Sequence, residues 1–251
     1  MMITIFTIAG SAVYAAEIPV SDQDQLITSR DWTEISNLQD EMKKEEPDAT
    51  IDYDKALKVY VDCNLIKLQT ADTKKLTSAL ESANYVWVIP FKMEKTYGMF
   101  TVAKGLPLRE EAKSVLTKAE QEEVKNHAGK WMITETAEHT VEPYYDILLE
   151  KREALSDCTR VVLVGSQPGM RQPVALGMDD ETARIWISLG YQYPVMKKIP
   201  ETQNVESGVY SFDSVAEISD TYIEDSEVST GAGVQSRSSM KYVAGIGIVL
   251  I

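Results

Sequence analysis

Alternation of apolar and polar residues predicts most of the strands in the middle of the chain. Residues 57–62 read Leu-Lys-Val-Tyr-Val-Asp, the pattern of a strand with one buried and one solvated face. Residues 85–91 are apolar at every position, so this strand is expected to lie centrally in a sheet that is covered on both sides. A short polar turn joins it to a strand over residues 97–104 as a hairpin. Further strands are predicted over residues 130–136, 160–164, 173–178 and 183–189.

Apolar residues three and four positions apart predict helices before and between these strands. Asp72 can cap one of them, and Thr117 with Glu120 has the sequence signature of a capping box. The helices are expected near residues 30–44, 73–83, 117–129 and 143–152. Hairpins mixed with helices are typical of an α+β fold rather than a doubly wound one. We therefore expect one α+β domain over residues 51–198, with a mainly antiparallel mixed sheet packed by two or three helices.

The first residues have features of a secretory signal peptide. Residues 1–16 carry no charge, and an apolar run is followed by small residues, so cleavage is expected after Ala15 or Ala16. A basic region before the apolar run is missing, and we therefore expect the natural reading frame to begin upstream of Met1. A buried N-terminal strand is the alternative, because the run contains several β-branched isoleucines.

The last residues form a second uncharged apolar run. Residues 242–251 carry no charge, but a helix that crosses a bilayer needs about 20 residues. We expect residues 241–251 to be the start of a membrane span that continues downstream, with a C-terminal core strand as the alternative. A signal peptide in front and a span behind would place the rest of the chain outside the cytoplasm, anchored to the cell membrane.

Charge is distributed unevenly along the 251 residues, whose formal net charge is −14. Residues 17–50 carry ten acidic and three basic residues, and residues 199–236 carry eight acidic residues and no basic one. We expect residues 17–50 to be an acidic segment with a short helix, and residues 199–240 to be a Ser/Thr-rich stalk. A short edge element around residues 210–218 would move the start of the stalk toward residue 220. Nucleic acid is not expected as a partner, because phosphate binding needs clustered Lys and Arg.

Histidines and nearby acids are the first residues to consider for chemistry. His127 and His139 are the only histidines, and Glu135 and Glu138 lie between them. Their spacing differs from the tight ligand spacing of zinc sites. We expect His127 to lie at a helix end and His139 in a solvated turn, and we expect neither to be needed for function.

Three other short segments are expected to be structural. Residues 165–169 read Gly-Ser-Gln-Pro-Gly, which is a hairpin loop rather than a nucleophile elbow because the serine directly follows the glycine. Residues 179–181 are three acids without an EF-hand pattern, so an acidic turn is expected. Cys63 and Cys158 either form a disulfide or remain two buried thiols. The strand tryptophans Trp87, Trp131 and Trp186 either lie in the core or line a ligand groove.

No catalytic, cofactor-binding or metal-binding residue is assigned from the sequence. The expected function is an exported, membrane-anchored surface protein whose domain binds an extracellular ligand or protein without catalysis. The alternative is a membrane-tethered hydrolase that acts on cell-wall or glycan material. A deep polar pocket around Glu135, Glu138 and His139 would favour the hydrolase, and a sheet without such a pocket would favour binding.

Overall fold

The structure of the chain is a computed structural model. It describes residues 18–139, 142–165, 167, 170, 172–190, 193, 195–200 and 204–226, with side chains omitted for residues 139 and 220–226. The expected signal peptide at 1–16, the later part of the expected stalk and the expected membrane span at 241–251 lie outside these residues. None of the helices in the described ranges has the length and apolar character that a bilayer span requires.

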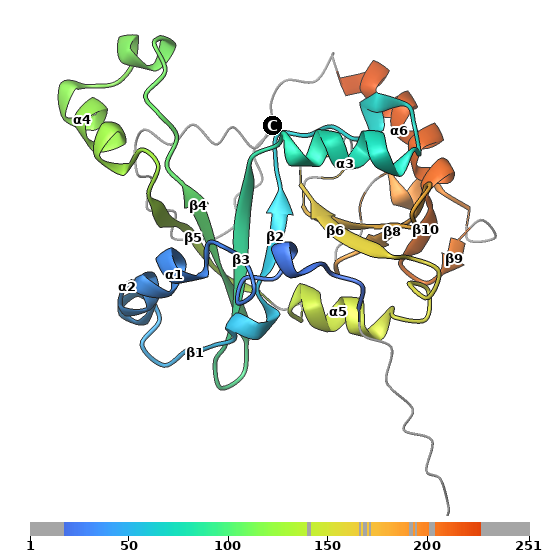
Figure 1. Ribbon diagram of the computed structural model, residues 1–251, viewed down its shortest axis with the longest axis horizontal. Helices are drawn as coiled ribbons and strands as arrows, with labels where there is room; N and C mark the ends of the chain where they lie inside the picture. The colour runs from blue at the N-terminus through green and yellow to red at the C-terminus, as the bar shows by residue number, and fades with distance from the viewer. Residues whose placement is uncertain are drawn as a thin grey trace, which may run out of the picture.

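One large sheet organises the described residues (Figure 1). Its ten strands run in the order β5-β4-β3-β2-β6-β7-β8-β10-β9, and β1 pairs with β3 outside this path. Only β2 and β6 pair in parallel among the described strands. The strands are β1 (Thr50–Ile51), β2 (Leu57–Tyr60), β3 (Tyr85–Lys92), β4 (Tyr97–Lys104), β5 (Trp131–His139), β6 (Arg160–Val164), β7 (Val174–Met178), β8 (Ala183–Ser188), β9 (Asn204–Glu206) and β10 (Val209–Ser211).

Helices are present at the four places where the sequence predicts them, and a further helix, Phe212–Ser226, occupies part of the segment expected to be a stalk. The Asp72 side chain accepts from the Lys75 backbone N–H, and Thr117 and Glu120 form the capping box. The segment near residues 30–44 is divided by a 3-10 turn over Ser36–Leu38. The helices are α1 (Trp32–Ile35), α2 (Gln39–Glu45), α3 (Thr73–Glu81), α4 (Lys118–His127), α5 (Tyr144–Glu150) and α6 (Phe212–Ser226). The α+β class and the mainly antiparallel mixed sheet are confirmed.

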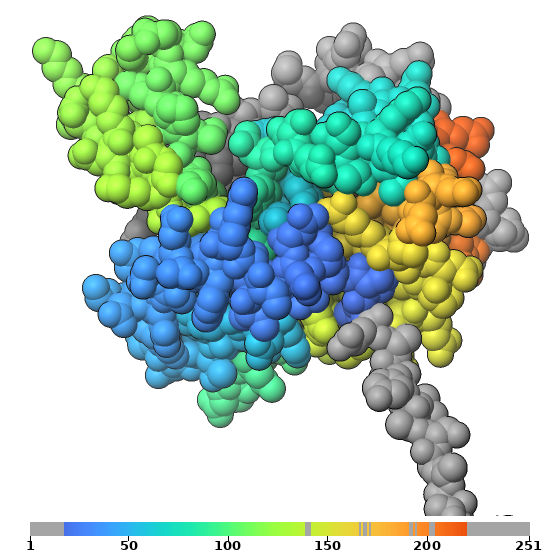
Figure 2. All heavy atoms as spheres, viewed as in Figure 1, coloured from blue at the N-terminus to red at the C-terminus, as the bar shows by residue number. Residues whose placement is uncertain are grey.

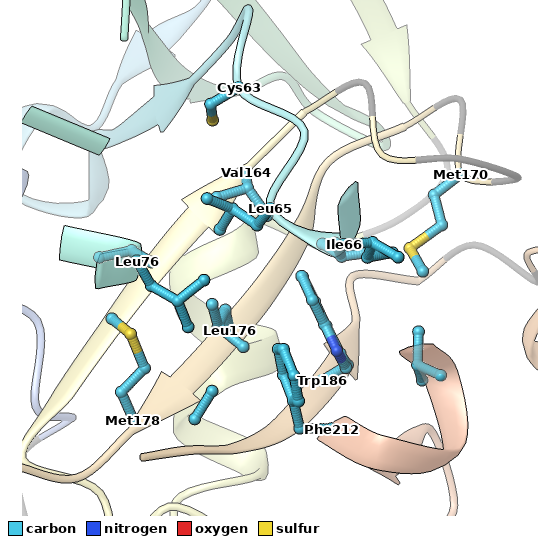
Figure 3. Packing of buried hydrophobic residues seen from close by; sticks show 14 of the residues in the cluster. Cys63, Leu65, Ile66, Leu76, Val164, Met170, Leu176, Met178, Trp186 and Phe212 are labelled. Carbon is cyan, nitrogen blue, oxygen red and sulfur yellow. The ribbon is translucent and has the colours of Figure 1, made fainter. Parts of the chain in front are cut away.

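Both faces of the sheet are covered, because alternate strand residues enter different hydrophobic clusters. Val59 and Leu163 pack on the face that α5 covers. Tyr60 and Val164 pack on the opposite face, beneath α3 and α6. Figure 3 shows this second cluster, in which Trp186 stacks on Phe212 with ring centroids 5.7 Å apart. A third cluster, with Trp87 at its centre, lies beneath α1 and α2.

The N-terminal segment, which we define as residues 18–49, belongs to the folded domain rather than to an acidic flank. Leu26, Ile35 and Met42 have no exposed surface. Val20 forms a bridge with β6, and Gln25 forms one with β2. The net charge of the segment conceals this packing, because its acids lie mostly on the solvent side of short helices whose other side is apolar.

The folded domain also continues beyond residue 198. β10 pairs with β8, and β9 pairs with β10. Val209 and Val215 are fully buried, and Phe212 is 5% exposed. The domain is therefore wider at both ends than the expected range of 51–198. The apolar residues around 210–218 are the sequence signal for this extension, because they recur within an otherwise polar stretch.

Candidate functional site

Two adjoining cavities open at one end of the sheet. The registers of β2, β3, β4 and β5 bring Tyr60 opposite Tyr85, and Lys104 opposite Trp131, at this end. A cavity of about 410 Å³, here called the polar cavity, lies between the N-terminal segment and the end of α3. A cavity of about 720 Å³, here called the arm cleft, lies between β3, β4 and residues 105–130, which we call the arm. Arg30, Ala83 and Tyr85 line both cavities, so the cavities adjoin, and together they are called the depression. Figure 2 shows the surface hollowed between α3 and the arm.

Asp24 is the centre of a buried charge network beside the polar cavity. Its carboxylate is 2% exposed and accepts hydrogen bonds from the Tyr60 hydroxyl at 2.7 Å and from Ser21 at 2.6 Å. Arg160 donates to the same carboxylate at 3.0 Å, and the Lys58 ammonium lies 3.5 Å from it. One carboxylate thus balances two partly or fully buried cations, and it ties the N-terminal segment to β2 and β6.

Burial changes the acid–base properties of this network. It lowers the pKa of the Lys58 ammonium, although the nearby Asp24 carboxylate opposes the change. It raises the pKa of the Tyr60 hydroxyl, and Asp24 adds to that effect. Lys58 also lies 4.6 Å from the centre of the Tyr85 ring, a cation–π distance. Lys58 is therefore held by a carboxylate and by aromatic rings, which is the arrangement of an anchoring group.

Asp31 forms a second anchor next to the first. Its carboxylate accepts from the Tyr85 hydroxyl at 2.8 Å and from the Trp87 indole N–H at 3.1 Å. Asp31 is 6% exposed, and its neighbour Arg30 lies 3.8 Å away with a side chain that is 85% exposed. Asp31 thus fixes the chain at the point where Arg30 projects into both cavities.

The sequence pattern does not predict the burial of the residues that form these anchors. Lys58 and Tyr60 are the polar members of an alternating strand, and were expected to face solvent, yet both are buried. Their partners Asp24 and Arg160 lie 34 or more residues away along the chain. One sequence feature does indicate that Lys58 and Tyr60 are buried. Strand β3 is apolar on both faces, so the sheet is covered on both sides there, and its neighbour β2 is covered as well.

The arm cleft combines aromatic and cationic walls. Tyr85 and Trp131 provide aromatic surface, and Arg30, Lys104 and Arg109 provide positive charge. The arm returns to the sheet through close backbone contact, because a Cβ atom at residue 105 would lie 2.2 Å from the His127 carbonyl oxygen. Glycine at residue 105 therefore allows the arm to close the cleft against the end of β4.

The two histidines are far apart in the fold. His127 ends α4 next to the start of β5, and His139 ends β5, opposite Tyr97. A strand of this length separates them by about 27 Å. The Nδ1 atom of His127 is buried and has no hydrogen-bond partner among the described residues. The part of the chain that the structure describes contains no group of three or more His, Cys, Asp or Glu residues placed to hold a metal ion.

Glu135 and Glu138 do not converge on a pocket. They lie three residues apart on β5, opposite Thr101 and Gly98, so they project from opposite faces of the sheet. Neither lines the polar cavity or the arm cleft. The polar pocket that would have favoured the hydrolase is not formed by these two residues.

Cys63 and Cys158 are free, buried thiols rather than a disulfide. They belong to the hydrophobic clusters on opposite faces of the sheet, which keeps their sulfur atoms apart. Burial raises the pKa of each thiol to about 11. Neither is a thiolate near neutral pH, so neither has the reactivity of a nucleophile.

The loop after β6 and the acidic turn both have structural roles. Gln167 is buried, donates to the carbonyl oxygens of Cys63 at 2.6 Å and Gly165 at 2.9 Å, and accepts from the Leu65 N–H. It therefore joins the loops that follow β2 and β6; residues 166, 168 and 169 lie outside the described residues. In the turn after β7, Asp179 accepts from two backbone N–H groups and from Arg184, as expected for a turn acid.

The three strand tryptophans divide between core and cleft. Trp87 and Trp186 are fully buried, which agrees with the core alternative. Trp131 is 7% exposed and lines the arm cleft, which agrees with the groove alternative for this one residue. Comparison of the chain with known protein families, with curated proteins and with solved structures found no match.

Proposed function

We propose that the chain is an exported, membrane-anchored protein whose α+β domain binds a ligand without catalysis, and that the ligand occupies the arm cleft. The observation that carries the proposal is the cleft itself. Its volume of about 720 Å³ falls within the roughly 300–1,000 Å³ of small-molecule sites, and its walls combine apolar surface with a few polar groups.

The cleft is preferred to a catalytic site because of what surrounds it. Lys58 and Tyr60, whose pKa values are shifted by burial, are engaged with Asp24 and serve as anchors. Glu135 and Glu138, around which a polar pocket would have favoured the hydrolase alternative, lie on different faces of β5. Convergent carboxylates are needed for glycoside hydrolysis by general acid–base chemistry, so binding is the better-supported function.

Export and anchoring rest on the sequence of the two ends. The uncharged run before residue 17 is typical of a signal peptide, and the apolar run after residue 241 is typical of the start of a membrane helix. Protease treatment of intact cells tests this part: digestion of residues 18–226 from the outside, with a fragment left in the membrane fraction, is expected. A chain that is protected in intact cells and recovered in the cytosol would contradict it.

Capture of a natural ligand tests the binding function. The full chain would be incubated with a small-molecule extract of the cells that make it, isolated, and its retained compounds identified by mass spectrometry. Ala83 lines both cavities, so Ala83→Trp is expected to abolish retention by filling the depression. Ser82→Trp places the same side chain on an exposed neighbour outside the cavities and should retain the compound. Retention that survives Ala83→Trp, or no retained compound at all, would contradict the proposal.

A further inference from the structure

We propose that the ligand of the arm cleft is an amphipathic organic anion: one carboxylate, or an anion of similar size, on an apolar body. This inference rests on the proposed binding function and adds its chemical class. It is drawn from three features of the cleft: the sign of its charge, the lack of anionic partners for Lys104 and Arg109 among the described residues, and its aromatic wall.

The charge of the cleft is opposite to that of the chain. The chain carries a formal net charge of −14, whereas the cleft is lined by Arg30, Lys104 and Arg109 and by a single acid, Asp62. The three cations come from the N-terminal segment, from the end of β4 and from the arm, so the fold brings them together from separate elements. A local concentration of one charge in a concave site attracts ligands of the opposite charge.

Two of these cations have no anionic partner within the described part of the chain. The Lys104 ammonium lies 5.5 Å from the centre of the Trp131 ring. Neither the Lys104 nor the Arg109 side chain forms a hydrogen bond or ion pair with a described residue. Lys58 and Arg160, in contrast, share the Asp24 carboxylate. Cations that are already paired hold the domain together, whereas Lys104 and Arg109 remain available to an incoming anion.

The apolar part of the ligand is inferred from the wall. Tyr85 and Trp131 lie 5.8 Å apart by ring centroids and form an aromatic surface on the sheet side of the cleft. Leu106 and Pro107 line the arm side. The indole N–H of Trp131 is buried without an acceptor among the described residues. A ligand that brings an acceptor to this end of the cleft would supply the missing hydrogen bond.

A matched pair of probes tests the inference. 4-Phenylbutyrate and 4-phenylbutan-1-ol share the same apolar body, and only the first carries a charge. Calorimetric titration of the full chain at low ionic strength is expected to show binding of 4-phenylbutyrate at least about tenfold tighter than the alcohol. This affinity should fall as salt is added, because exposed charges are screened.

Substitutions of the cleft cations distinguish binding in the cleft from attraction to general surface charge. Lys104→Met and Arg109→Gln are each expected to weaken 4-phenylbutyrate binding about fivefold or more. Lys92→Met is the matched control: Lys92 also ends a strand and lies over an aromatic ring, 5.9 Å from the centre of the Tyr97 ring, but lines neither cavity. It should leave the affinity unchanged.

Several outcomes would overturn the inference. These are equal affinity for the acid and the alcohol, no binding of the acid, and equal weakening by Lys92→Met and Lys104→Met. The proposed function is judged separately by the extract experiment. A neutral compound that is retained by the parent chain and lost with Ala83→Trp would overturn the anionic class and leave the cleft as a binding site.

Discussion

The N-terminal segment and the arm each contribute a wall to the depression, and they are held to the sheet in different ways. The N-terminal segment buries Leu26, Ile35 and Met42 completely and is fixed by the Asp24 carboxylate. In the arm, Val124 is the only buried side chain among residues 105–130, and Val115 is 80% exposed. Figure 1 shows the arm, with α4, standing away from the body of the domain.

The difference separates the residues that make the fold from those that make the site. A segment with many buried contacts and a paired charge has little freedom to adapt, and its loss affects the whole domain. A segment held mainly by its own capping box and by the base of a hairpin contributes little to the core. The arm is therefore the wall whose sequence is available for ligand recognition.

Removal of the N-terminal segment is expected to have the largest effect. A fragment of residues 51–226 loses three side chains that have no exposed surface, each worth about 1.5–3 kcal/mol of burial. Together these approach the whole stability of a typical domain, which is about 5–15 kcal/mol. Thermal melting followed by circular dichroism should show no cooperative transition. A melt close to that of residues 18–226 would refute the assignment of this segment to the core.

Asp24→Asn should be the most damaging single substitution in the same segment. The variant leaves Lys58 and Arg160 without their shared carboxylate, and loss of one partner from a buried charge network costs about 3–5 kcal/mol. Urea unfolding measures the loss. Asp22→Asn is the control, because Asp22 is exposed two residues earlier, and it should stay within about 0.5 kcal/mol of the parent. Equal effects of the two variants would show that the network is not an anchor.

Replacement of the arm should have a small effect on stability and a large one on binding. The Gly105 N–H donates to the Lys130 carbonyl oxygen, so residues 106–129 can be exchanged for an Asn-Gly hairpin turn. The free energy of unfolding should change by about 1 kcal/mol or less, because surface loop length has a weak effect on stability. Binding of 4-phenylbutyrate should be lost. Loss of cooperative folding would place the arm among the elements of the core.

Glu46→Gln should give the smallest effect, and one that depends on pH. Glu46 lies where the N-terminal segment meets β5, and burial, followed by Glu138 and Glu45, raises its pKa above the ordinary value of 4.5. The folded state therefore disfavours the charged form, and this penalty is present above the raised pKa. Glu46→Gln should raise the melting temperature slightly at pH 7, and the gain should vanish as the pH falls through the raised pKa toward 4.5. A gain that persists at pH 3 would argue against this cause.

Much of the fold was predictable because its signals are local. The capping box of Thr117 and Glu120 and the cap at Asp72 each depend on residues three positions apart. The central position of β3 follows from the apolar character of both its faces. These features require no knowledge of distant segments, and the structure contains each of them.

The site was not predictable because its residues meet only through the tertiary fold. Arg30 lies 74 positions before Lys104, and Arg109 follows Lys104 by five positions within the arm. No spacing rule connects Arg30 with the other two cations. Burial of Lys58 depends on its ion pair with Asp24. The acidic composition around Asp24 predicts a flank outside the domain instead. Local patterns report which face of a strand is apolar, but not which distant charge will cover the other face.

Nuclear magnetic resonance of the tryptophan indoles shows whether the ligand binds in the arm cleft. Addition of 4-phenylbutyrate to the ¹⁵N-labelled chain should shift the Trp131 indole N–H signal in a saturable way, because Trp131 lines the cleft. The signals of Trp87 and Trp186, which are fully buried in the core, should stay in place. A stationary Trp131 signal, or equal shifts of all three, would contradict the account.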